Sequence, residues 1–369
     1  MSRVYRLLGN LVKQIPPPNH PNHILILKPC CIGDVVMTTP LLQAIRHHYP
    51  QAKITFAVGH WSIGALEGQK AIDNLIDIGE ASNPAKSLRG LWRLVKQLRA
   101  QKCDMAFIPD RSPLLGLAVW LARIPHRIGL DSVGRGFAYT TRATVYPDEE
   151  INEGEIYLRL ARILNIPTDG MYTHIDIPEQ KRVEIQQKLA DKTIHSPYVV
   201  IHPAGGANPG MLMSSKRWLP QHFAQVGDWL HQTYGATLIL IGAKSDTPIV
   251  EAVIGHLKSP YHNWVGELSL MQIGALGASA MLYMGNDTGL THLVAGTGTK
   301  TVMILGPSSP KRYAPFTPNG LAIWKPTSLP TGGVSEAGLD WDWERDGVGV
   351  DETIAQISAF LGRATGGEL

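Results

Sequence analysis

Short apolar segments with the length of β-strands alternate along this chain with segments whose apolar residues recur at helical spacing. No other feature of the sequence constrains the fold as strongly. Strands that are apolar throughout and separated by helices are typical of a parallel sheet with helices on both faces. In the first half, the predicted strands cover residues 24–28, 53–58, 74–78 and 104–108, and the predicted helices cover residues 40–49 and 87–100.

The second half repeats this alternation without repeating the sequence. Its predicted strands cover residues 198–202, 237–242, 281–285 and 301–306. A chain of 369 residues exceeds the usual size of one core. We therefore expect an α/β fold of two doubly wound, Rossmann-like domains facing a central cleft, where the carboxyl ends of the strands hold ligands. The expected domains are residues 1–180 and residues 181–369, with packing of the last helix on the first domain left open.

Cysteine content and hydropathy argue against a disulfide-stabilised, a membrane-spanning or a secreted protein. The cysteines are Cys30, Cys31 and Cys103, and an odd count with two neighbours is a poor disulfide framework. No apolar run approaches the roughly 20 residues that a membrane-spanning helix needs, and no secretory signal is recognisable at the start. These features predict a cytoplasmic protein without a metal site.

A polar turn follows the first predicted strand, in the segment from Lys28 to Val36. Gly33 permits a tight turn there, but the single glycine does not match a dinucleotide-binding fingerprint. Asp34 has two interpretations: a general base facing the predicted cleft, or the cap of the following helix. Capping is the commoner use of an aspartate at such a position.

Two further segments follow strands of the second half. After His202, a glycine-rich turn leads to Ser214, Ser215 and Lys216, which could hold a diphosphate or could form a solvated loop. After residues 281–285, the sequence Asn-Asp-Thr-Gly opens a helix. The backbone N–H groups at such a helix start favour phosphate.

Within that second segment, Asp287 or Thr288 can cap the helix, and Gly289 follows at its start. His292 lies about one turn further on, on a face shared with Thr288. It could donate a hydrogen bond to a phosphate or a sugar hydroxyl, or it could be a buried structural histidine.

Positive charge is concentrated in the first half of the chain. Residues 1–190 hold 23 Lys and Arg against 17 Asp and Glu, whereas residues 191–369 hold 11 against 14. The excess is too small to indicate nucleic acid, but it favours an anionic partner for the first domain. The basic residues on one face of the helix at 87–100 are either a solvated surface or a contact for lipid head groups.

Together these segments resemble glycosyltransferase family 9, the bacterial heptosyltransferases of lipopolysaccharide core assembly. The resemblance rests on ILILKPCCIGDVVMTTPLLQAIRHHYP, VVIHPAGGANPGMLMSSKRW and GNDTGLTHLVAGTGTKTVMILGPSSP, which occur in the order typical of the family and span most of residues 24–315. The chain departs from the family at Cys30-Cys31, where small polar residues are common, and at Lys28, where arginine is common.

The resemblance implies a GT-B fold and inverting transfer of a sugar, typically a heptose, from a nucleoside diphosphate donor of the ADP-heptose type. It implies no cofactor and no metal, with Asp34 as the base. The implied acceptor is an anionic, lipid-linked saccharide at the inner membrane face. The positive charge of the first half adds Arg127, Arg135 and Arg142 as candidate contacts of that acceptor, because they follow predicted strands or turns and could reach the cleft. The implied donor-binding residues are Gly33, His202, Ser214, Ser215, Lys216, Asp287, Thr288, Gly289 and His292.

Other functions remain compatible with the same residues. One alternative is a GT-B enzyme that uses another donor or has epimerase activity. Another alternative is a non-catalytic module that binds a nucleotide sugar, although Asp34 is present in this chain.

Overall fold

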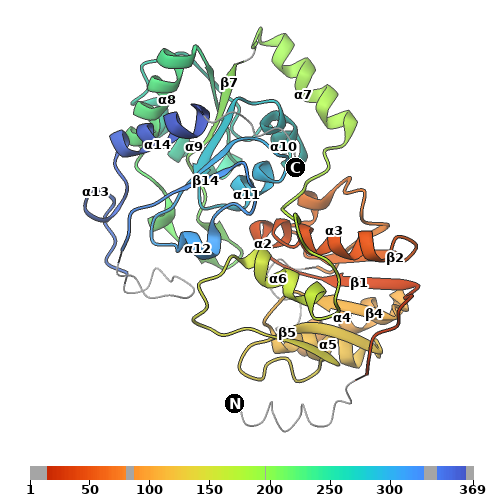
Figure 1. Cartoon of the computed structure of the whole chain (residues 1–369). Helices are drawn as coiled ribbons and strands as arrows, with labels where there is room; N and C mark the ends of the chain where they lie inside the picture. Colours follow the sequence, from red (N-terminus) through yellow and green to blue (C-terminus); the bar gives the residue numbers. More distant parts are fainter. Residues whose placement is uncertain (1–14, 80–86, 196, 328–338, 363–369) are drawn as a thin grey trace. The chain divides into compact units, whose positions relative to one another are not determined.

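A computed structural model describes residues 15–79, 87–195, 197–327 and 339–362 (Figure 1). The chain divides into two compact units, Met1–Asp176 and Ile177–Leu369. Each unit contains a parallel six-stranded sheet with helices on both faces, which confirms the expected α/β class and the Rossmann-like architecture. Within the described ranges, no helix is both long and apolar enough to cross a membrane.

The sheet of the first unit has the strand order β3-β2-β1-β4-β5-β6, and all its pairings are parallel. The strands are β1 (His23–Leu27), β2 (Lys53–Val58), β3 (Asn74–Asp77), β4 (Met105–Ile108), β5 (His126–Asp131) and β6 (Thr141–Thr144). The chain proceeds outward in one direction from β1 to β3 and in the other from β4 to β6. The switch point therefore lies between β1 and β4, where sheets of this kind bind ligands.

Helices cover both faces of this sheet because successive strand residues point to opposite sides. On one face, α4 and α5 pack together over Leu25, Leu27 and Ala106. On the other face lie α3 and α6, which pack against each other. The helical segments of the unit are α2 (Ile32–Val36), α3 (Thr39–His48), the 3₁₀ turn η1 (Ile63–Leu66), α4 (Leu88–Gln101), α5 (Pro113–Leu121) and α6 (Glu153–Arg162).

The sheet of the second unit has the corresponding order β11-β10-β7-β12-β13-β14, again entirely parallel. Its switch point lies between β7 and β12. The strands are β7 (Tyr198–His202), β10 (Thr237–Leu240), β11 (Tyr261–Asn263), β12 (Leu282–Asn286), β13 (Thr301–Ile304) and β14 (Gly320–Ile323). A separate antiparallel pair, β8 (Ala207–Asn208) and β9 (Met211–Leu212), lies in the loop after β7.

Helices α8, α9 and α14 share one apolar core with the sheet, and α7, α10 and α11 pack in sequence with one another. The last helix packs on α8 and β14 of its own unit. The helical segments are α7 (Glu179–Asp191), η2 (Ser214–Lys216), α8 (Pro220–Tyr234), η3 (Lys244–Asp246), α9 (Thr247–Ile254), α10 (Leu270–Ala278), α11 (Gly289–Ala295), α12 (Pro310–Tyr313), α13 (Trp343–Asp346) and α14 (Val350–Gly362).

Close packing inside the first unit depends on one glycine of β5. A β-carbon added at Gly129 would overlap the ring of Tyr139, which is buried. We expect Gly129→Ala to lower the free energy of unfolding by about 1–3 kcal/mol, because the buried ring has to shift. Chemical denaturation measures this loss. Gly255→Ala is the control, since its new β-carbon would make only ordinary contacts; equal stability of the two variants would contradict the prediction.

Candidate active site

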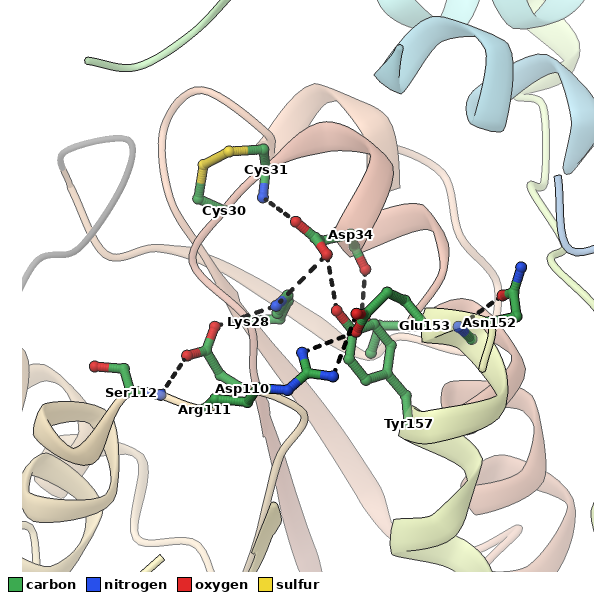
Figure 2. A network of polar contacts seen from close by, with 12 residues as sticks. Lys28, Cys30, Cys31, Asp34, Asp110, Arg111, Ser112, Asn152, Glu153 and Tyr157 are labelled. Carbon is green, nitrogen blue, oxygen red and sulfur yellow. Dashed lines mark hydrogen bonds and ion pairs between the residues drawn. A yellow bond between two sulfur atoms is a disulfide. The ribbon is translucent and has the colours of Figure 1, made fainter. Parts of the chain in front are cut away.

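A network of buried and half-buried charges lies at the switch point of the first unit (Figure 2). Lys28 follows β1, and its ammonium group donates to Asp110 Oδ2, after β4, at 3.1 Å. The same ammonium lies 4.0 Å from Asp34 Oδ1. Burial alone would lower the pKa of Lys28, but the attraction of Asp110 and Asp34 raises it above its usual value. Lys28 is therefore a fixed positive charge beside Asp34.

Helix α6 adds two side chains to this network, one turn apart. Glu153 accepts two hydrogen bonds from the Arg111 guanidinium, at 2.9 and 3.2 Å. Tyr157 donates its hydroxyl to Asp34 Oδ1 at 2.8 Å. Neither residue was predicted from the sequence, although their spacing of four places them on one face of the helix. Figure 2 shows how they converge with Lys28 and Asp34 from separate elements.

Asp34 lies in the first turn of the short helix α2, and its side chain is 37% exposed. Its Oδ2 accepts from the backbone N–H of Cys31, the residue before the helix, at 3.4 Å. The interpretation of Asp34 as the helix cap is wrong, because Cys31 is the N-cap of α2 and Asp34 is the third residue of the helix. One oxygen of Asp34 contacts the helix start, and the other contacts Tyr157. The partial exposure leaves the carboxylate accessible to a substrate. Gly33, its neighbour in α2, is half-buried.

Cys30 and Cys31 form a disulfide in the turn before α2. This bond was not predicted from the sequence, because counting cysteines tests for bridges between distant segments. Neighbouring cysteines close a small ring made only of their own backbone and side-chain atoms, so it joins no distant segments. Cys103 is a free, buried thiol.

The three arginines predicted to bind the acceptor occupy different environments. Arg127 is buried near the amino end of β5, where its guanidinium donates to the carbonyl oxygens of Ala138, Ile124 and Pro125. Arg142, in β6, donates to backbone carbonyls of Tyr139 and Phe137. Only Arg135 is exposed in the loop after the carboxyl end of β5.

The switch point of the second unit is tied together by a buried amide. The Asn286 side chain donates to the carbonyls of Pro203 and Ala204 and accepts from the backbone N–H of Trp218. It thereby joins the loop after β7 to the end of β12. His202, at the end of β7, is buried, and its Nδ1 lies 3.5 Å from Thr288 Oγ1.

Two glycines bring the loop after β7 close to its neighbours. Gly205 has φ of 113°, and a β-carbon there would overlap the Thr288 methyl group. Gly206 has φ of 73°, and a β-carbon there would overlap the carbonyl oxygen of Met213. Both backbone conformations favour glycine.

Lys216 is the predicted diphosphate-binding residue, and it forms an ion pair with buried Asp287 at 2.6 Å. Burial acts to raise the pKa of Asp287, but Lys216 outweighs it and holds that pKa below its usual value. The ammonium also lies 5.4 Å from the centre of the Tyr313 ring. Ser214 is exposed and Ser215 half-buried in the same 3₁₀ turn, η2.

The sequence left either Asp287 or Thr288 as the cap of α11, and the structure shows that Thr288 is the cap. Its Oγ1 accepts from the backbone N–H of Thr291 at 3.4 Å. Thr291 in turn donates its hydroxyl to the Asn286 carbonyl. Gly289 begins the helix and is half-buried, whereas His292 is buried one turn later. In the described part of the chain, no group of three or more His, Cys, Asp and Glu side chains could hold a metal ion.

Comparison with known proteins assigns this architecture to a family. The model of glycosyltransferase family 9 (heptosyltransferase) matches residues 91–332. A lipooligosaccharide heptosyltransferase 2 from Haemophilus influenzae is 25% identical, with 82% of this chain and 88% of that protein covered. A lipopolysaccharide heptosyltransferase 2 from Salmonella typhimurium is 26% identical, with 80% of this chain and 84% of the relative covered.

Solved structures share the fold along nearly the whole chain. A family 9 glycosyltransferase from Veillonella parvula has a TM-score of 0.76 at 20% identity, covering 93% of this chain and 98% of its own. The ADP-heptose lipopolysaccharide heptosyltransferase II of E. coli has a TM-score of 0.71 at 21% identity, covering 92% and 98%. The likeness confirms a GT-B-type fold. The chain belongs to glycosyltransferase family 9, the heptosyltransferase family, and is a glycosyltransferase.

Proposed function

We propose that this enzyme transfers a heptose, with inversion, from an ADP-heptose-type donor to a saccharide of the lipopolysaccharide core type. The observation that carries the proposal is the accessible carboxylate of Asp34 at the first switch point. The relatives named as heptosyltransferases support the choice of sugar and acceptor. The E. coli heptosyltransferase of the same fold, which is named for ADP-heptose, supports the choice of donor.

In the proposed reaction, Asp34 accepts the proton of an acceptor hydroxyl while that oxygen attacks the anomeric carbon. The bond between the anomeric carbon and the diphosphate oxygen breaks, and the leaving diphosphate takes the electron pair. A positioned general base typically contributes about 10²–10⁴-fold to such a step. Lys28 stabilises the ionised form of Asp34 at the start, since its ammonium lies nearby.

We propose that the second unit binds the donor diphosphate at its own switch point. Lys216 would shift from Asp287 toward the diphosphate or interact with both, which would balance the charge that develops on the leaving group. The backbone of Gly205 and Gly206 and the capped start of α11 would provide N–H donors, with Gly289 and His292 beside them. We propose that the transfer needs neither a metal ion nor a cofactor.

For the acceptor, we retain only Arg135 of the three predicted arginines. Its side chain is exposed beyond the carboxyl end of β5, the edge of the sheet that also holds Asp34. The guanidinium groups of Arg127 and Arg142 already donate to backbone carbonyls. Those two residues are better explained as supports of β5 and β6 than as contacts of an anionic saccharide.

We also propose that α4 contacts an anionic membrane surface, which would place the enzyme beside a lipid-linked acceptor. The basic face of α4 consists of exposed Arg89, Arg93, Lys96 and Arg99, and exposed Leu88 and Trp92 lie on the same side. Leu91, Leu94, Val95 and Leu98 are buried opposite. A tryptophan among basic residues suits the membrane interface, where its ring is half in apolar and half in polar surroundings.

Asp34→Asn is expected to reduce kcat by at least about 100-fold while the affinity for ADP stays the same, because an amide cannot accept the proton. Steady-state kinetics with an ADP-heptose donor and a calorimetric titration with ADP measure the two quantities. Asp148→Asn, an exposed loop residue, is the matched control. Turnover near the wild-type level in Asp34→Asn would remove Asp34 as the base, and with it this proposed mechanism.

Lys216→Ala is expected to weaken ADP binding by about 10–100-fold, the size of one charge-assisted hydrogen bond. Isothermal titration calorimetry measures the change. Lys258→Ala is the control, because Lys258 is exposed before β11, at the opposite edge of the same sheet. Unchanged affinity in Lys216→Ala, with a folded protein confirmed by circular dichroism, would exclude Lys216 from diphosphate binding.

Replacing Arg89, Arg93 and Lys96 together by Glu is expected to abolish flotation with vesicles that contain anionic phospholipid. Each basic residue near such a surface contributes about 1 kcal/mol, so the reversal of three should suffice. Wild-type binding should decrease as salt is raised. The charge-matched control replaces Lys70, Lys192 and Lys258 together by Glu, because all three are exposed and lie outside α4. Absence of wild-type flotation at low salt, or equal loss in the control, would mean that the basic face is only solvated.

A further inference from the structure

Tyr157 contacts the proposed base directly from another element of the first unit. It extends from α6, and its hydroxyl donates to Asp34 Oδ1 at 2.8 Å although the two residues are 123 positions apart in the sequence. The tyrosine is completely buried. A buried hydroxyl that donates to a carboxylate stabilises the ionised form of that carboxylate and restricts its rotation.

The position of Tyr157 is fixed from several sides. Helix α6 begins at a cap, where the Asn152 side chain accepts from the backbone N–H of Gly154. One turn before Tyr157, Glu153 is joined to Arg111 by two hydrogen bonds. The Lys28 ammonium lies over the tyrosine ring, 5.0 Å from its centre. These contacts hold the phenol in place beside Asp34, so its hydrogen bond limits the orientations of the carboxylate (Figure 2).

The hydroxyl remains protonated, so it can only act as a donor toward the carboxylate. Burial raises the pKa of Tyr157 well above its usual value, and the negative charge of Asp34 adds to the effect. Proton transfer from the tyrosine to Asp34 is therefore unfavourable near neutral pH. Tyr157 also lacks the exposure that contact with a sugar would need.

We propose that Tyr157 is a positioning residue of the transfer reaction: it orients the Asp34 carboxylate toward the acceptor hydroxyl and keeps it ionised. This inference rests on the proposed role of Asp34 as the base. Tyr157 touches neither the donor nor the acceptor in this scheme. Its effect is transmitted through the single hydrogen bond to Oδ1.

The charged groups that face Asp34 determine what a pH measurement can show. Within the described part of the first unit they include Lys28 after β1, Asp110 and Arg111 after β4, and Glu153 of α6. The neighbouring turn η1, Ile63–Leu66, contributes no titratable side chain. Cys30 and Cys31 do not titrate while they form a disulfide. Removing the tyrosine hydroxyl leaves all of these charges in place, so a change in Asp34 titration reports the lost hydrogen bond.

The test is Tyr157→Phe, which removes the hydroxyl and keeps the ring. Loss of a donor to the charged form raises the pKa of Asp34, so the acidic limb of the kcat/KM profile should move to higher pH by about one unit. On the alkaline side of that limb, kcat should remain about tenfold below wild type because the carboxylate is less well oriented, while KM changes little. Carbon-13 NMR titration of the Asp34 carboxyl measures the same pKa without turnover.

Tyr139→Phe is the matched control, because Tyr139 is equally buried in the same unit and has no hydrogen bond with Asp34 among its known contacts. It should leave both the pH profile and the carboxyl titration as in wild type. An unchanged Asp34 titration and an unchanged kcat in folded Tyr157→Phe would overturn the inference. A loss of kcat equal in Tyr157→Phe and Tyr139→Phe, with no shift of the acidic limb, would also overturn it, since packing alone would then be responsible.

The role of the base and the role of the positioning residue are tested separately. If Asp34→Asn retains turnover, the proposed base is wrong whatever Tyr157 does. If Asp34→Asn is inactive and Tyr157→Phe matches wild type in kcat and in the NMR titration, only the positioning role is wrong.

Discussion

The parallel pairing of β1 with β4, and of β7 with β12, is the constraint on which the rest of the structure depends. Because all neighbouring strands run in the same direction, every loop that leaves a carboxyl end lies at one edge of its sheet. At each switch point, two such loops diverge from neighbouring strands. Lys28 and Asp110 meet at the first switch point, and His202 and Thr288 meet at the second. Residues far apart in sequence thus form compact sites.

The central strands could be predicted from sequence, whereas several outer strands could not. Segments such as residues 53–58 and 198–202 are mostly apolar, and both are strands with those same bounds. In contrast, β5 contains Arg127, whose charge interrupts the apolar run and is stabilised only by backbone carbonyls of the folded protein. At the edge of the sheet, β6 (Thr141–Thr144) is short and largely polar, so its own sequence does not indicate a strand. It forms a strand because it pairs with β5.

Some features of the candidate site could be predicted from the local sequence, and others depend on contacts between distant segments. Thr288 could be predicted as a possible helix cap from its immediate neighbours, and this local chemistry is present in the structure. Asp34 stands out because it follows a strand, but its contact with Tyr157 depends on how α6 packs in the folded unit, where it lies against α3. No local pattern reports such a contact across 123 positions. The bond between Cys30 and Cys31 escapes prediction for a different reason, since adjacency counts against a disulfide framework.

The two switch points differ in chemistry in the way that a transfer reaction requires. The first combines three carboxylates, of Asp34, Asp110 and Glu153, with Lys28 and Arg111, so its negative charges exceed its positive charges by one. The excess negative charge repels a diphosphate, while Lys28 and the Tyr157 hydroxyl favour the ionised form of Asp34. The second combines one ion pair with glycine backbone and a capped helix start, which together provide donors for an anion. In the proposed reaction, proton acceptance and stabilisation of the leaving group therefore belong to different units, and productive transfer requires the acceptor bound by one to reach the donor bound by the other.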